Sequence, residues 1–203
     1  MRRTKAEAEE TRVSILVAAE RVFYEKGVAN STLDEIAAAA GVTRGAIYWH
    51  FESKSALFLE LYNAAQLPRV NMGDAAGAGC EDTDPILAVE TIALEWLSTL
   101  AKDVQRQRLL TILLRTNYEG EFQSVLRELE MLDEEHSSNM ERIFSKAAAK
   151  GQLSQDWTPL TCSRAIKWLI KGTCWEWLLF GQKFNLTAAG GDGLRRLLAS
   201  FRS

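Results

Sequence analysis

The chain has 203 residues, of which 47% are hydrophobic and 25% are charged, and its formal net charge is −3. A chain of this length and hydrophobic content can bury a substantial core, which argues against an intrinsically disordered protein. A net charge so close to neutrality argues against a protein that coats nucleic acid through bulk positive charge. The three cysteines show no CxxC spacing, so we expect a reducing cytoplasm and neither a disulfide framework nor a metal site.

Apolar residues recur at helical spacing along the chain, which predicts an all-α fold of about nine helices without strands. The first helix is expected from about residue 6 to 26, with Ile15, Ala19 and Phe23 on its apolar face and Gly27 as its stop. No stretch approaches about 18 uninterrupted apolar residues, and the N-terminus lacks the apolar segment of a signal peptide. We therefore expect no membrane span.

Two short helices around a tight turn are expected within residues 31–54. Thr32 and Glu35 have the spacing of a capping box at the start of the first. Gly41 can take the positive φ that ends it, and Thr43 can cap the second. This is the pattern of a helix-turn-helix, whose second helix enters the major groove of DNA.

The second of these helices carries side chains suited to DNA. Arg44 can reach guanine O6 and N7 or a phosphate, and Gly45 lets the backbone approach the duplex closely. Tyr48 and Trp49 can contact phosphates, sugars or thymine methyl groups, or they are simply packed aromatic side chains. Free amides at the start of the first helix offer a phosphate site. The predicted DNA-binding residues are Ser31, Thr32, Thr43, Arg44, Gly45, Tyr48, Trp49, His50 and Lys54.

The helix-turn-helix segment is not basic overall. Residues 1–67 contain eight Lys and Arg against nine Asp and Glu. DNA binding would therefore depend on where the positive charges are placed. Two such segments in a homodimer would bind a double-stranded, pseudo-palindromic operator with half-sites about 34 Å apart.

The rest of the chain is also predicted to be helical. A helix from Ser53 is expected to end or kink at Pro68, before a loop over 71–84. Asp84 and Thr158 each precede a proline, which is the pattern of an N-cap followed by proline at the first helical position. Further helices are expected at about 85–101, 105–118, 122–149, 159–180 and in a last segment ending near 201.

The helix at 159–180 is apolar nearly all round, although Arg164, Lys167 and Lys171 interrupt it. A helix that is apolar on both sides is buried on both. In a chain of this size, one side is expected in the protomer core and the other against a second subunit. Gly172 would let a partner helix approach closely.

The helix-turn-helix segment resembles the DNA-binding signature of TetR/AcrR transcriptional regulators. The resemblance lies in the run Thr-Leu-Asp-Glu-Ile-Ala at 32–37, the run Ala-Gly-Val-Thr-Arg-Gly-Ala-Ile-Tyr-Trp-His-Phe at 40–51, and Lys54. The resemblance is to AcrR-like repressors of multidrug efflux pumps in particular. It implies a helix-turn-helix domain over 1–52 and a ligand-binding and dimerisation domain over 53–203, connected by the helix near residue 53. The function implied is a ligand-responsive repressor that a hydrophobic small molecule releases from its operator.

The resemblance also implies two further sets of residues. An effector pocket among the middle helices would include Val89, Ile92, Trp96, Leu110, Leu114, His136, Met140, Lys167, Ile170, Lys171 and Trp175. A four-helix dimer interface formed by the last two helices would include Ala165, Trp168, Leu169, Gly172, Leu194, Leu197 and Leu198.

Several alternatives remain open at this point. The tryptophans can be structural core, and Lys167 and Lys171 either face the pocket or pair with acids of the 122–149 helix. The chain has two histidines and no nucleophile elbow, Walker A loop or HExxH pattern, so neither an enzyme nor a cofactor is expected. A regulator of a metabolic gene set in the same family and a helical protein-interaction module are the other functions considered.

Overall fold

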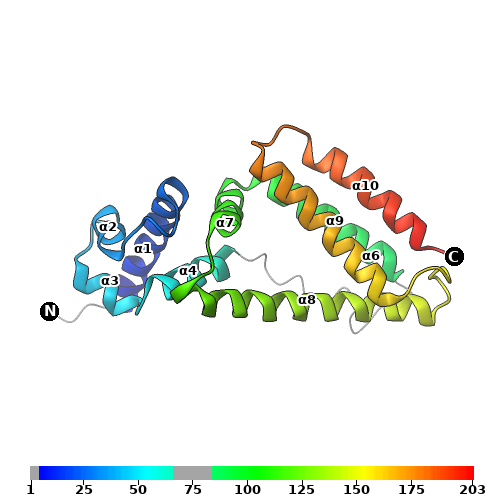
Figure 1. Ribbon diagram of the computed structural model, residues 1–203, viewed down its shortest axis with the longest axis horizontal. Coiled ribbons are helices and arrows are strands. Elements are labelled where there is room, and N and C mark those ends of the chain that lie inside the picture. Colours follow the sequence, from blue (N-terminus) through cyan, green and yellow to red (C-terminus); the bar gives the residue numbers. More distant parts are fainter. Residues whose placement is uncertain (1–4, 66–83) are drawn as a thin grey trace. The chain divides into compact units, whose positions relative to one another are not determined.

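The computed structural model describes residues 5–65 and 84–203. Over these ranges the chain forms nine α-helices and one short 3-10 helix, and the only β-type pairing is an isolated bridge between Leu153 and Arg202 (Figure 1). The predicted all-α fold is therefore confirmed. Within the same ranges, no helix combines the length and apolar character that crossing a bilayer would need. The predicted kink at Pro68 and the loop up to residue 83 lie outside the described residues.

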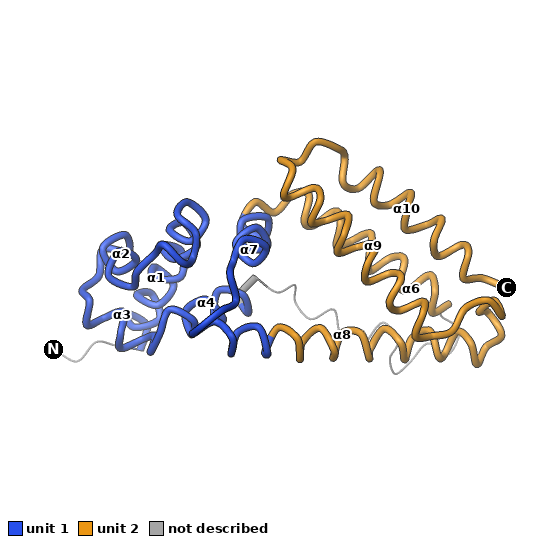
Figure 2. The backbone as a smooth tube through the Cα atoms, in the orientation of Figure 1, with its two compact units in different colours: residues 1–66, 105–128 blue, residues 67–104, 129–203 orange. Residues whose placement is uncertain are grey.

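The chain divides into two compact units (Figure 2). Unit 1 comprises residues 1–66 and 105–128, and unit 2 comprises residues 67–104 and 129–203. The first unit contains α1 (Lys5–Lys26), α2 (Leu33–Ala39), α3 (Arg44–His50), α4 (Lys54–Ala65), nearly all of α7 (Val104–Arg115), η1 (Gly120–Phe122) and the start of α8 (Gln123–Ala149). The second contains α6 (Pro85–Lys102), the rest of α8, α9 (Pro159–Leu179) and α10 (Leu186–Phe201).

Unit 1 extends beyond the helix-turn-helix domain that was predicted to end at residue 52. The ring of Phe58 on α4 lies 6.2 Å from that of Phe23 on α1 and 5.5 Å from that of Phe122, between ring centroids. Buried Glu20 of α1 accepts a hydrogen bond from Gln105 Nε2 of α7 at 3.1 Å. Aromatic packing and this polar contact hold α4 and α7 against α1, so the compact unit includes segments that are distant in sequence.

Unit 2 has its core where α6, α8, α9 and α10 meet. Its largest buried members include Phe144 of α8, Ile166 of α9 and Phe201 of α10. Gly190 and Gly191 lie inside α10, and Asn185 caps that helix. A Cβ at either glycine would lie 3.1 Å from a leucine side chain of α6. The glycines therefore allow α10 to pack closely on α6.

The predicted helix ends agree with the structure where a local signal marks them. Asp84 and Thr158 cap α6 and α9 as expected, each followed by a proline. The helix predicted over 105–118 instead ends at Arg115. The Thr116 hydroxyl bonds the Ile112 carbonyl at 2.7 Å and the Tyr118 hydroxyl bonds the Leu113 carbonyl at 2.9 Å, so side chains satisfy the last carbonyls of α7.

Candidate DNA interface and effector-binding helices

The start of α2 is fixed by a complete capping box. Thr32 Oγ1 accepts from the Glu35 amide at 3.2 Å, and Glu35 Oε2 accepts from the Thr32 amide at 3.0 Å. Lys26 Nζ at the end of α1 donates to Glu35 Oε1 at 2.8 Å. The hydrogen bond from Lys26 and that from the Thr32 amide lower the pKa of Glu35. The Glu35 carboxylate is thus ionised near neutral pH and links α1 to α2.

The turn between α2 and α3 has the predicted geometry. Gly41 has a φ of +68°, which a residue with a side chain rarely adopts. Thr43 caps α3 by accepting from the Ala46 amide at 3.2 Å. Ile47 is fully buried and anchors α3 from beneath. Together these contacts determine which face of α3 points away from the core.

That outward face carries the predicted DNA-contacting side chains. Trp49 is 74% exposed and Tyr48 is also exposed, so the alternative of packed core aromatics is wrong. The Arg44 guanidinium lies 5.5 Å from the centre of the Tyr48 ring and 3.2 Å from the Asp34 carboxylate of α2. Nothing lies within 4 Å of a Cβ placed at Gly45, so a duplex has room to approach there. Asp34 was missed in the sequence because it lies on a different helix from its partner.

Ser31 and the Thr32 amide do not form the predicted phosphate site. Ser31 is buried, and both its hydroxyl and its amide bond the carbonyl of Val28, at 2.8 and 3.3 Å. The Thr32 amide is taken by Glu35. The Val28 carbonyl and the capping box therefore use the donors that the sequence suggested were free.

Lys54 is also committed within the fold. Its side chain is only 16% exposed, and Nζ donates to the carbonyls of Val28 and Ser31 at 2.9 and 3.0 Å. The Phe122 ring lies 5.9 Å from the same ammonium group. The predicted phosphate contact is thus replaced by an internal one, in which Lys54 ties the start of α4 to the turn before α2.

The predicted effector residues do not share one environment. Val89 is only 1% exposed and belongs to the unit 2 core, whereas His136 and Trp175 are exposed. These three cannot line an enclosed pocket in the described conformation. Half-buried side chains within unit 2 are Ile92, Trp96, Met140 and Ile170. The remaining apolar pair, Leu110 and Leu114, is half-buried in unit 1.

Lys167 and Lys171 pair with α8, which was the second of the two alternatives considered. Their Nζ atoms lie 3.1 and 2.5 Å from the two oxygens of Asp133, and Lys167 also bonds Ser137 Oγ at 3.0 Å. Partial burial raises the pKa of Asp133, but the two ammonium groups outweigh it and hold the pKa below its usual value. The cluster holds α8 and α9 together.

The predicted dimer residues separate into two groups. Trp168 is 65% exposed on α9, and Gly172 is exposed one turn further on. Leu194 and Leu198 are buried in the core of their own protomer, so their assignment to the interface is wrong. Half-buried residues that contact the same core are Ala165, Leu169 and Leu197. The periodicity of α10 marks an apolar face but does not say which partner covers it.

One face of α9 is exposed from Trp168 to Leu179. Trp168, Gly172, Trp175 and Leu179 follow at intervals of four, three and four residues, and all are exposed. Trp175 was predicted in the pocket and Leu179 was not singled out as an interface residue. The interval pattern is that of one helix face, so the sequence already places these four residues on one side of the helix.

Comparison with known proteins agrees with this geometry. Residues 15–61 match the description "Bacterial regulatory proteins, tetR family". The chain is 36% identical to the HTH-type transcriptional repressor BepR of Brucella suis, over 100% of this chain and 97% of BepR. It is 32% identical to NalD, the secondary repressor of the MexAB-OprM multidrug efflux pump in Pseudomonas aeruginosa, with a TM-score of 0.88 and 98% of each chain covered.

A second similar structure contains a small molecule. The complex of SmeT, a Stenotrophomonas maltophilia repressor, with triclosan has a TM-score of 0.84 and 26% identity. The match covers 96% of this chain and 92% of SmeT. The likeness therefore extends through both units and is not confined to the helix-turn-helix.

Proposed function

The chain belongs to the tetR family of bacterial regulatory proteins, and we propose that it represses a multidrug efflux pump operon and is released by a hydrophobic small molecule. DNA binding follows from the family, whose members are transcriptional regulators and not enzymes. The observation that supports it in this chain is the outward face of α3, where Arg44, Tyr48 and Trp49 project from a helix anchored by buried Ile47. Control of a pump is supported by the likeness to NalD along the whole chain.

We further propose that the active form is a homodimer joined through the exposed stripe of α9. Exposed tryptophans are unfavourable in water, and burying a side chain of this kind contributes about 2–3 kcal/mol. Gly172 in the middle of the stripe would allow the partner helix to lie close. Two recognition helices would then bind successive major grooves, about 34 Å apart, in a pseudo-palindromic operator.

The effector is expected to contact half-buried apolar side chains of unit 2. Ile92, Trp96, Met140 and Ile170 are accessible without opening the core that contains Val89. SmeT binds triclosan, which is an apolar phenol, and this supports an effector of similar character. Release requires that the effector bind the DNA-incompetent state more tightly, with a coupling free energy of typically 1–3 kcal/mol.

The proposal is tested by fluorescence anisotropy with the DNA upstream of the chain's own gene, at two salt concentrations, with and without triclosan. Sequence-dependent binding that triclosan weakens is expected. Specific binding that neither triclosan nor other apolar drugs weaken would keep the DNA function and reject the proposed effector class. Absence of specific binding to that DNA and to any duplex selected from random sequences would reject the repressor.

A further inference from the structure

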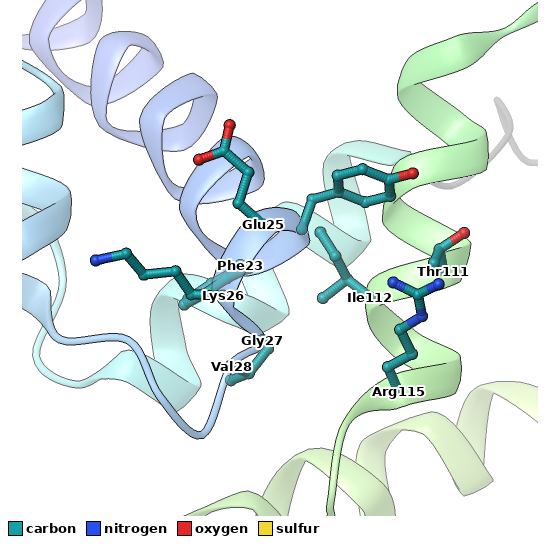
Figure 3. A pocket seen from close by; sticks show the side chains of 9 residues that line it. Phe23, Glu25, Lys26, Gly27, Val28, Thr111, Ile112 and Arg115 are labelled. Carbon is teal, nitrogen blue, oxygen red and sulfur yellow. The ribbon is translucent and has the colours of Figure 1, made fainter.

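A cavity of about 250 Å³ lies within unit 1, and none of the predicted effector residues lines it. It is formed by the last turn of α1 and the residues after it on one side and by α7 on the other (Figure 3). Drug-sized ligands occupy pockets of roughly 300–1,000 Å³, so this cavity suits a smaller molecule with a single ring.

The lining of the cavity is mixed, with apolar side chains at its base and polar or charged side chains around them. Phe23 and Val28 on the α1 side and Ile112 on α7 are all nearly fully buried. Thr111 also lines the cavity, but its hydroxyl already donates to the Gln107 carbonyl at 2.7 Å. An occupant would therefore gain apolar contacts on one part of its surface and would face polar groups on the rest.

Three charged residues line the cavity, namely Glu25, Lys26 and Arg115, and of these Arg115 lies on its α7 side. Arg115 is exposed, and within the described parts of the chain no hydrogen bond or ion pair holds its guanidinium. Figure 3 shows this guanidinium directed toward Thr111, whereas the Lys26 ammonium and the Glu25 carboxylate point away from α7. The Lys26 ammonium is in any case bonded to Glu35.

We propose that this cavity binds a small aromatic carboxylate at Arg115, as a second ligand site independent of the unit 2 effector. A guanidinium presents two parallel N–H groups that match the two oxygens of a carboxylate. The carboxylate therefore lies against Arg115, and the ring lies toward Phe23, Val28 and Ile112.

The cavity adjoins the contacts that position the helix-turn-helix. Val28, which lines it, accepts hydrogen bonds through its carbonyl from the Lys54 ammonium and from the Ser31 hydroxyl. Lys26, two residues earlier, bonds the capping-box carboxylate of Glu35. An occupant therefore contacts the segment that links α1 to α2 and α4.

The test is isothermal titration calorimetry of the full chain with sodium benzoate, against benzamide as a ligand of the same shape without the charge, at matched sodium concentration. Benzoate is expected to bind and benzamide to bind about tenfold more weakly or not at all, because a hydrogen bond to a charged group is worth about 1.5–3 kcal/mol. Arg115→Gln is expected to weaken benzoate binding by a similar factor, and Arg115→Lys by less.

Two control variants locate the site. Arg127→Gln removes another exposed arginine of unit 1 that has no bonded partner among the described residues, and it should leave benzoate binding unchanged. Trp96→Ala alters unit 2 and should also leave it unchanged. Undetectable benzoate binding, equal binding of benzamide, or full affinity in Arg115→Gln would each overturn the proposal. Loss in Trp96→Ala alone would place benzoate in the unit 2 effector site and would equally overturn it.

Discussion

The replacement Lys54→Met tests whether this lysine serves the fold or the DNA. The side chain is mostly buried, and its ammonium bonds two carbonyls, those of Val28 and Ser31. Each hydrogen bond from a charged donor contributes about 1.5–3 kcal/mol. The Val28 carbonyl keeps its bonds from Ser31, so only part of this sum is lost. Methionine retains the apolar stem, and we expect the free energy of unfolding to fall by about 2 kcal/mol.

Urea unfolding followed by circular dichroism, at one fixed protein concentration, measures this loss. The slope of the logarithm of the DNA-binding constant against the logarithm of salt concentration is measured alongside, at a temperature where both proteins are folded. Removing a phosphate contact would reduce the slope by about 0.9 per protomer, and the internal role predicts no change. Lys26→Met is the control, because it removes an exposed ion pair worth about 0–1 kcal/mol. Unchanged stability with a shallower slope would refute the internal role of Lys54.

Three further outcomes are expected. Arg44→Ala should weaken binding to the cognate operator by about 1–3 kcal/mol with little effect on random duplex, and equal loss on both would show that Arg44 contacts only phosphate. Trp168→Glu should convert the dimer to a monomer in sedimentation velocity, whereas Leu87→Glu, at another exposed apolar position, should not; a dimeric Trp168→Glu protein would exclude the α9 stripe as the interface. The Asp133→Asn protein should lose less stability than the parent protein as pH falls from about 5 to 3. The reason is that a carboxylate with a depressed folded pKa stabilises the fold above its unfolded pKa and loses that contribution as it is protonated. Parallel curves of unfolding free energy against pH for the two proteins, measured in urea, would contradict this.

Helix starts were predictable from the sequence because their signals are local. Thr32, Thr43, Asp84 and Thr158 each cap a helix in the structure, as their short hydroxyl or carboxylate side chains and the residues after them indicate. A cap needs only the backbone amides of the next three residues. The signal at Gly41 is local as well, because a positive φ is required where one helix ends and the next begins within so few residues.

Long-range partners could not be predicted in the same way. Lys54 bonds carbonyls 26 and 23 residues earlier, and nothing near it in the sequence shows that a backbone acceptor is within reach. Leu198 and Trp168 are both apolar residues at helical spacing, yet one lies in the protomer core and the other is exposed. Periodicity identifies an apolar face but contains no information about whether the same chain or a second one covers it.

The near-neutral charge of the helix-turn-helix segment has a structural explanation that bears on specificity. Arg44 lies beside Asp34 and Lys26 bonds Glu35, so two cations of this segment are already partly compensated. The nearby Asp34 carboxylate lowers the attraction of Arg44 for phosphates. Contacts with phosphates carry no information about the base sequence. The guanidinium has five N–H groups, and Asp34 contacts it through one nitrogen, so donors remain for a guanine edge. We therefore expect this pairing to weaken non-specific binding more than base recognition, so that a segment without excess positive charge would still distinguish its operator from other DNA.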